Sequence, residues 1–144
     1  MKRFAVDTSC MIATVCSWHE RHESAARAVE RRLRRGEQLT VAAHSLVETY
    51  AVLTRLPSPH RLAPSDAWAL VEANFVEESA VIALDATRQV SLLRTLSAQG
   101  IGGGRSYDAL IAECARRGNA SALLTFNPRH FEPGPEGVLI EEPS

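Results

Sequence analysis

Three acidic residues stand at separated points of the chain, each beside apolar sequence. Asp7 follows the short apolar run FAV, Glu48 lies within the run LVETYAVL, and Asp108 directly precedes ALIA. An unpaired carboxylate is costly to bury, so acids in such surroundings need a partner. Hard divalent cations such as Mg²⁺ prefer carboxylate oxygens and take few protein ligands, because they keep several waters. The three acids are therefore candidates for a metal site that activates water for attack on a phosphodiester bond.

Each acid also has a structural interpretation that the sequence leaves open. Asp7 could cap the helix or turn that follows it, through a side-chain oxygen. Glu48 could lie in solvent on a narrow polar stripe of its helix, with Thr49 and Arg55. Asp108 could serve only as a negative charge in a first helical turn, where the helix dipole stabilises it. The three together favour a metal site more than any one does alone.

Residues with hydroxyl, amide or guanidinium groups near the acids are candidates for contacts with a substrate. They are Thr8, Ser9, Arg105, Thr125 and Arg129. Asn127 could offer a neutral oxygen to a metal, or serve simply as a turn residue with Pro128. The other candidates have ordinary alternatives as turn, strand-core or surface residues.

Apolar residues recur with the spacing of strands and helices in alternation along the chain. The expected strands cover residues 3–6, 39–42, 80–84, 122–125 and an edge segment, 138–140. The expected helices cover residues 19–35, 45–56, 64–74, 86–98 and 106–117, the last capped by Ser106. We interpret residues 7–9 as a turn. Because parallel strands need crossover connections, this order predicts an α/β fold, a three-layer α/β/α sandwich with a mostly parallel central sheet.

Functional groups of an open parallel sheet gather at the carboxyl ends of its strands. Asp7 follows the first expected strand, and the turn at residues 125–127 follows the fourth. We therefore expect these polar groups to meet at one edge of the sheet.

Length and composition bound the class of protein. A chain of 144 residues, 45% apolar and 23% charged, predicts a single domain over residues 1–144, with an acidic tail after residue 140 that we expect to fray. The formal net charge of -1 conceals a basic segment, since residues 27–35 hold five arginines and one glutamate. These arginines could track an RNA backbone or form a solvated helix face.

The cysteines and the lack of long apolar stretches predict a soluble, cytoplasmic protein. Cys10, Cys16 and Cys114 cannot all pair within the chain and show no zinc spacing, which favours a reducing compartment. The N-terminal segment lacks a signal-peptide pattern, because Asp7 interrupts it and no small-residue cleavage site follows. No apolar stretch approaches the length that crosses a bilayer.

Four segments together resemble the PIN domain, and more narrowly the VapC toxins of bacterial toxin–antitoxin pairs: VDTS, VETYAVLTRL, GRSYDALIAECA and LLTFNPRHF. The resemblance spans nearly the whole chain in the family's order, and YDALIA is its most specific part. It implies that Asp7, Glu48 and Asp108 are the acids that coordinate Mg²⁺ or Mn²⁺. It also implies an α/β/α fold with a parallel sheet, often dimeric. One departure is that Asn127 stands where many relatives carry a fourth acid.

The function that the resemblance implies is a Mg²⁺-dependent endoribonuclease, the toxin of a toxin–antitoxin pair. Its expected partners are RNA, a VapB-like antitoxin and a second copy of the chain. Apolar positions on the helix of Glu48 and on residues 67–75 could receive these proteins or pack in the core. One alternative is a PIN-like module that holds RNA or protein without cutting. Another is a phosphatase with Asp7 as nucleophile, but such enzymes usually place a second aspartate where this chain has Ser9.

Overall fold

The computed structural model describes residues 1–144, and its five strands form one sheet in which every neighbouring pair is parallel. The spatial order is β3-β2-β1-β4-β5, so β1 lies at the centre. The strands are β1 Arg3–Val6, β2 Gln38–Ala42, β3 Ala80–Ile82, β4 Ala120–Leu124 and β5 Leu139–Glu141. The predicted parallel sheet is confirmed. Because Val6 pairs with Leu124, the polar residues that follow β1 and β4 leave the sheet at neighbouring points of one edge.

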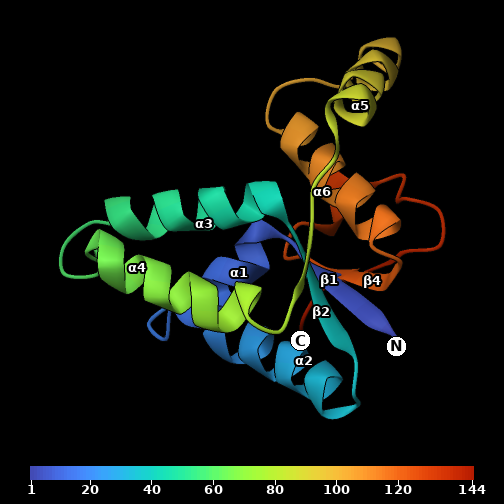
Figure 1. The fold of residues 1–144 in the computed structure, drawn as a ribbon. Coiled ribbons are helices and arrows are strands. Elements are labelled where there is room, and N and C mark those ends of the chain that lie inside the picture. Colours follow the sequence, from blue (N-terminus) through green and yellow to red (C-terminus); the bar gives the residue numbers. More distant parts are fainter.

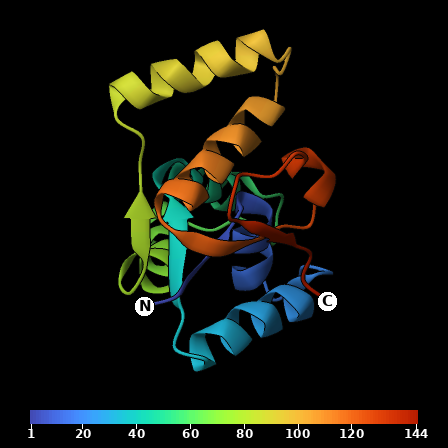
Figure 2. The same ribbon diagram turned by 90° about the vertical axis from the view of Figure 1, so that its right-hand side faces the viewer.

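Helices cover both faces of the sheet, which confirms the three-layer α/β/α sandwich. They are α1 Thr8–Val15, α2 His22–Arg34, α3 Ala43–Arg55, α4 Pro64–Val71, α5 Ala86–Ala98 and α6 Arg105–Arg117, with short helical segments at Glu72–Val76 and Pro128–Phe131. Figure 2 shows α6 on one side of the sheet and α2 on the other. Helices α3 and α4 run side by side (Figure 1). None of the helices is both long and apolar enough to cross a membrane.

The alternation of side chains along β1 builds a core on each face of the sheet. Phe4 and Val6 belong to a buried cluster with residues of α1 and α2, including Val29. Ala5 points the other way, into a cluster with residues of α6 such as Ile111. A strand that is buried on both faces appears in the sequence as a continuous apolar run, and this is why FAV predicts a strand.

A helix begins where the sequence predicted a turn. The interpretation of residues 7–9 as a turn is wrong, because α1 starts at Thr8 and continues to Val15. Asp7 is its N-cap, and the Asp7 side chain accepts a hydrogen bond from the Cys10 N–H. The helix is short and apolar on most of its circumference, so the alternation of apolar and polar residues that marks an exposed helix is missing.

Other element boundaries differ from the expected ones by one to three residues. The strand expected over residues 80–84 ends at Ile82, and the helix expected from Ser106 begins at Arg105. The residue before this helix is Gly104, which makes no side-chain capping bond. Ser106 therefore lies within the first turn of α6 and does not cap it.

Helix α5 lies at the edge of the molecule, beyond α6 (Figures 1 and 2). Its only buried residue is Leu96, whereas Val90 and Leu93 are 47% and 56% exposed. Asp85 caps its first turn by accepting a hydrogen bond from the Arg88 N–H. The helix thus contributes little to the core and presents apolar side chains to solvent.

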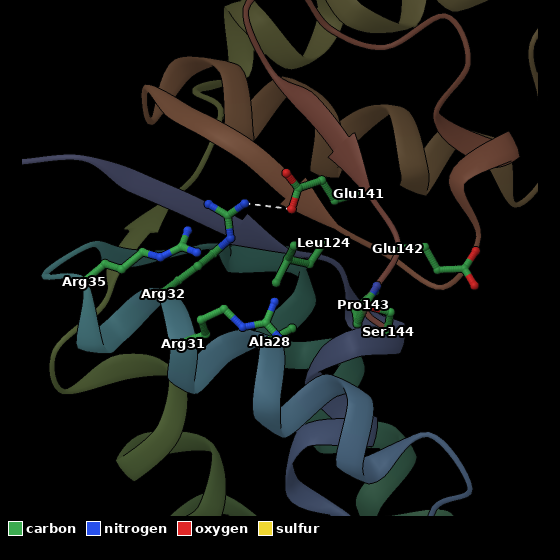
Figure 3. Close-up of a pocket in the computed structure, with 9 residues that line it drawn as sticks. All are labelled: Ala28, Arg31, Arg32, Arg35, Leu124, Glu141, Glu142, Pro143 and Ser144. Carbon is green, nitrogen blue, oxygen red and sulfur yellow. Dashed lines mark hydrogen bonds and ion pairs between the residues drawn. The ribbon is translucent and has the colours of Figure 1, made fainter.

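An ion-pair bridge ties α2 to the sheet. Arg32 donates to Glu37, just before β2, at 2.9 Å and to Glu141, in β5, at 2.7 Å. Figure 3 shows the bond between Arg32 and Glu141 beside the last residues of the chain. The acidic tail that we expected to fray follows this bridge, and Pro143 within it is buried.

All three cysteines are free and buried. Burial is the main cause that raises the pKa of the Cys114 thiol to about 11, and the charge of Glu113 adds to it. Burial raises the pKa of Cys10 and Cys16 as well. These thiols are therefore protonated at neutral pH and pack as apolar side chains.

Candidate metal centre

Asp7 directly follows β1, at the edge of the sheet where the residues after β4 also lie. It is only 4% exposed. Oδ1 accepts hydrogen bonds from the Ser9 hydroxyl at 2.7 Å and from the Cys10 N–H at 3.0 Å. Oδ2 accepts one from the Thr125 hydroxyl at 2.6 Å. Three donors therefore fix the orientation of this carboxylate.

Burial and hydrogen bonding act in opposite directions on the Asp7 carboxyl. Burial is the largest cause and raises its pKa, while the bonds from Thr125, Ser9 and the Cys10 N–H lower it. The negative charge of Glu48 raises the pKa further, and the net shift is upward. The surroundings of Asp7 thus disfavour its ionised form. A cation beside the carboxylate would stabilise that form and lower the pKa again.

Two of the hydroxyls predicted to contact a substrate have different partners within the chain. Thr125, which is fully buried, donates to Asp7 and accepts a hydrogen bond from the Asn127 N–H at 2.9 Å. Thr8 donates to the Ser45 hydroxyl at 3.1 Å, which joins α1 to α3. Thr125 therefore positions the acid, whereas Thr8 joins two helices.

Helices α3 and α6 carry the other two acids. The Glu48 side chain is 35% exposed, and its Oε2 lies 3.7 Å from Nε2 of His44, one turn earlier in α3. The Asp108 side chain, in the first turn of α6, is 22% exposed. Its Oδ2 lies 3.5 Å from Nδ1 of His130. Each of these acids therefore has a histidine beside it.

The three acids lie close enough together to affect one another's ionisation. Burial is the largest cause that raises the pKa of Asp108, and the neighbouring His130 opposes it. The charges of Asp7 and Glu48 then raise the Asp108 pKa further, and Glu48 acts in the same direction on Asp7. The fold thus brings acids from the end of β1, from α3 and from α6 near one another, and their joint binding of a metal stays a prediction.

The donor set fits a hard divalent cation by its chemistry. As the side chains are oriented, no group of three acidic, histidine or cysteine residues is close enough to hold a metal ion. The acids nevertheless repel one another, and a shared cation would turn this repulsion into attraction. Asp7 also keeps an open acceptor position, because a carboxylate has about four lone-pair sites and three are filled. Carboxylate oxygens without thiolates suit Mg²⁺ or Mn²⁺.

Two hollows lie beside the end of the sheet that holds Asp7, Glu48 and Asp108, which we call the acid edge. One, of about 330 Å³, is lined in part by Ser9 and Asn127. The other, of about 300 Å³, is lined in part by Arg105, Asp108 and His130. The first hollow borders Ser9, which bonds Asp7, and the second borders Asp108 itself.

The remaining predicted contacts lie around the second hollow and the loop after β4. An Nη of Arg105 donates to the Glu132 carbonyl at 3.2 Å, which holds its guanidinium beside Asp108. Arg129 is exposed, as is Asn127. The contact of Asn127 with a metal stays a prediction. The contacts of Arg105 and Arg129 with phosphate stay predictions as well.

The basic segment of α2 divides into paired and unpaired arginines. Arg32 forms the bridge described above, and Arg34 pairs with Glu30 at 2.7 Å in solvent. Arg31 and Arg35 line a pocket with the last residues of the chain (Figure 3). At least two arginines of this segment thus have partners within the chain. Fewer of its positive charges are therefore free to bind RNA phosphates.

Sequence reasoning gave no role to His44 and did not consider Tyr107, yet both lie beside the acids. The His44 and Tyr107 rings are stacked, with centroids 5.0 Å apart and planes at 6°. The spacing of four residues between His44 and Glu48 would place them on one helix face. The signal was lost because the helix was expected to begin at residue 45, one residue after His44, whereas α3 begins at Ala43.

A parallel sheet in an α/β/α sandwich, with acids from β1, α3 and α6 gathered at its carboxyl edge, defines the class of protein. Residues 4–133 match the PIN domain, and the chain belongs to this family.

Within the family, the chain is similar to VapC proteins. It is 43% identical to Ribonuclease VapC40 of Mycobacterium tuberculosis over 89% of both chains. It is 38% identical to Ribonuclease VapC27 of the same organism, over 77% of this chain and 75% of the relative.

Solved structures agree on the fold. The crystal structure of VapC20 of M. tuberculosis, described as a Sarcin-Ricin loop cleaving toxin, gives a TM-score of 0.69 at 20% identity, over 94% of this chain and 98% of the other. VapBC2 from Rickettsia felis bound to a DNA fragment from its promoter gives 0.69 at 17% identity, over 99% of both chains. The sandwich inferred from sequence is therefore that of known VapC structures.

Proposed function

We propose that this chain is a Mg²⁺-dependent endoribonuclease and the toxin of a toxin–antitoxin pair. The observation that carries the proposal is the Asp7 carboxylate directly after β1, which is buried and oriented by three hydrogen bonds, with Glu48 and Asp108 near it. RNA as the substrate is supported by the relatives named ribonucleases, which are similar over most of the chain. The toxin role and a cytoplasmic place of action follow from the VapC-like character of the sequence.

The three acids would hold the cation, Mg²⁺ or Mn²⁺, and the Asn127 amide oxygen is a fourth candidate ligand. When bound, the cation supplies a water that ionises near neutral pH and stabilises negative charge on the phosphate oxygens. Because Asn127 is neutral, it offers less attraction for a second cation than an acid would.

The chain's own residues position these groups. Ser9 and Thr125 hold the Asp7 carboxylate in one orientation through bonds of 2.7 and 2.6 Å. Arg105, held by the Glu132 carbonyl, and the exposed Arg129 would neutralise the RNA phosphates on either side of the bond that breaks.

A phosphatase with Asp7 as the nucleophile is not supported by the geometry. Such phosphatases usually place a second aspartate two residues after the nucleophile, where this chain has Ser9. The Ser9 hydroxyl instead donates a hydrogen bond to Asp7 at 2.7 Å.

A VapB-like antitoxin is the proposed partner of a groove between α3 and α4. The groove has a volume of about 390 Å³ and is lined by Leu46, Val47, Tyr50, Trp68 and Val71. Val47 is 69% exposed and Trp68 is 47% exposed, which suits an amphipathic helix laid into an apolar groove. The proposed second copy of the chain would cover the exposed apolar side chains of α5, Val90 and Leu93.

The test is cleavage of single-stranded RNA by the purified chain, freed of any partner. We expect cleavage with Mg²⁺, none with a chelator, and a loss of at least ~100-fold in Asp7→Asn, since removal of a cation ligand removes the water it activates. Equal cleavage by the variant would contradict the proposal. RNA binding that is independent of metal and unaffected by Asp108→Asn, without cleavage, would identify a binding module instead.

A further inference from the structure

An exposed aromatic ring lies at the rim of the acid edge without a role in the core. Tyr107 is 53% exposed and belongs to none of the buried clusters. It stands in the first turn of α6, directly before Asp108. An exposed aromatic ring beside a site for a nucleic-acid phosphate is a candidate to stack on a base.

The ring of Tyr107 is held in place by a second ring. His44 stacks on it with centroids 5.0 Å apart and planes at 6°. Nε2 of His44 is buried and makes no hydrogen bond, so this imidazole is held by the stack and by a longer contact, of 3.7 Å, with Oε2 of Glu48. With one face against His44 and more than half of the residue exposed, Tyr107 presents a ring in a fixed orientation to solvent.

The stacked pair reaches one of the three acids through His44, whose Nε2 lies 3.7 Å from Oε2 of Glu48. Tyr107 also precedes Asp108 in the first turn of α6. A nucleotide whose phosphate lies at the acids would therefore have its base within reach of the Tyr107 ring.

We propose that Tyr107, backed by His44, is a stacking subsite for an unpaired base next to the RNA phosphate that is cleaved. Unpaired bases stack on aromatic side chains, and every base offers a π face, so such a subsite tolerates any base. Bases within a duplex are already stacked on their neighbours and cannot use it. The inference rests on the proposed ribonuclease function.

The chain contains a matched control for this subsite. Trp18 is also exposed, at 47%, and also stacks on a histidine, with its centroid 4.2 Å from that of His60. This pair joins the loop after α1 to the loop after α3, and it contacts none of the three acids. Trp18 is therefore also an exposed ring stacked on a histidine, but it lies away from the three acids.

The experiment measures binding of a single-stranded RNA that carries the fluorescent base 2-aminopurine to the intact chain, with Ca²⁺ in place of Mg²⁺ so that the acids keep a cation, and the RNA is checked for cleavage after each measurement. Stacking on Tyr107 quenches the fluorescence. We expect Tyr107→Leu to lose the quenching and to weaken binding about tenfold, as base stacking on an aromatic ring contributes. Tyr107→Phe and Tyr107→Trp should keep both the quenching and the affinity. Trp18→Leu should show the same quenching and affinity as the parent.

The outcomes separate this inference from the proposed function. Equal quenching and affinity in Tyr107→Leu and the parent would overturn the stacking subsite, as would loss of binding in Tyr107→Trp. If the chain with Mg²⁺ cleaves RNA and Tyr107→Leu cleaves single-stranded RNA equally well, only the subsite fails. If the chain neither binds nor cleaves RNA, the proposed function fails and the subsite with it.

Discussion

The hydrogen bonds on Asp7 explain how a nearly buried acid keeps a single orientation. Ser9, Cys10 and Thr125 supply three donors, and each comes from the backbone or from a short side chain with little freedom. These groups act through Asp7 and are therefore positioning residues. Such partners of a metal ligand typically affect activity or affinity by about 10- to 100-fold.

The first prediction concerns Thr125→Val, which keeps the shape of the side chain and removes its hydroxyl. Asp7 loses a donor that stabilises its charge, so its pKa should rise further in the metal-free protein, which NMR of the Asp7 carboxyl carbon can measure. RNA cleavage should fall about 10- to 100-fold. Thr8→Val is the control, because its hydroxyl bonds Ser45 and not the acid. An unchanged Asp7 titration in Thr125→Val would contradict this role.

The second prediction concerns the pH dependence of stability and uses Asp108→Asn. The pKa of Asp108 is raised in the folded chain, chiefly by burial, so the folded state binds this proton more readily than the unfolded state. Its stabilising contribution is fully present below the ordinary value of 3.8 and is lost as the pH rises through the raised pKa. At pH 7 without metal, the variant should therefore melt above the parent, by about 2–4 °C for a change near 1 kcal/mol.

Thermal melts at pH 7 and near pH 3 test whether Asp108→Asn raises the melting temperature. The difference should vanish at the lower pH, and Mg²⁺ should raise the melting temperature of the parent more than that of Asp108→Asn. Asp85→Asn is the control, because the Arg88 N–H bond to Asp85 lowers the pKa of that carboxyl. A variant that melts below the parent at pH 7 without metal would contradict the account.

At the scale of elements, the sequence predicted what apolar periodicity encodes and missed what depends on contacts between elements. The parallel strands and the helices around Glu48 and Asp108 follow from their apolar patterns. Helix α1 was missed because most of its sides are apolar, and only the Asp7 cap marks its start. The stack of His44 on Tyr107 joins α3 to α6, so no local spacing could have predicted it.

The third prediction concerns the bridge that ties α2 to two strands. Arg32→Met should leave Glu37 buried without its partner, because the Glu37 side chain is 4% exposed. Removing one partner of a buried ion pair costs about 3–5 kcal/mol, and the partial exposure of Glu141 places our expectation at the lower end. Urea denaturation measures this loss.

The matched control for the bridge is Arg34→Met. Arg34 pairs with Glu30 while both side chains are largely in solvent, at 78% and 61% exposed. Exposed pairs of this kind contribute about 0.2–1 kcal/mol, so the loss should be much smaller. Similar losses in the two variants would show that Arg32 does not act as a bridge.

At the scale of the whole molecule, the acid edge has the wrong charge for an RNA ligand unless a cation is bound. Asp7, Glu48 and Asp108 would repel a phosphate, and the arginines that flank them are few. A cation shared by the acids changes the sign of this interaction. The position of Asp7 after β1 could be predicted from the sequence, but the approach of Glu48 and Asp108 to it could not, because that depends on how α3 and α6 pack against the sheet.

The claim that these three acids form one metal site is tested most directly by Mn²⁺ binding, measured from the electron paramagnetic resonance signal of the free ion. The parent chain should bind Mn²⁺, and Asp7→Asn, Glu48→Gln and Asp108→Asn should each weaken binding at least ~10-fold, as expected when a carboxylate ligand is lost. Glu30→Gln, which changes an exposed acid on α2, should bind as the parent does. Binding of equal strength in the parent and all three acid variants would contradict the account.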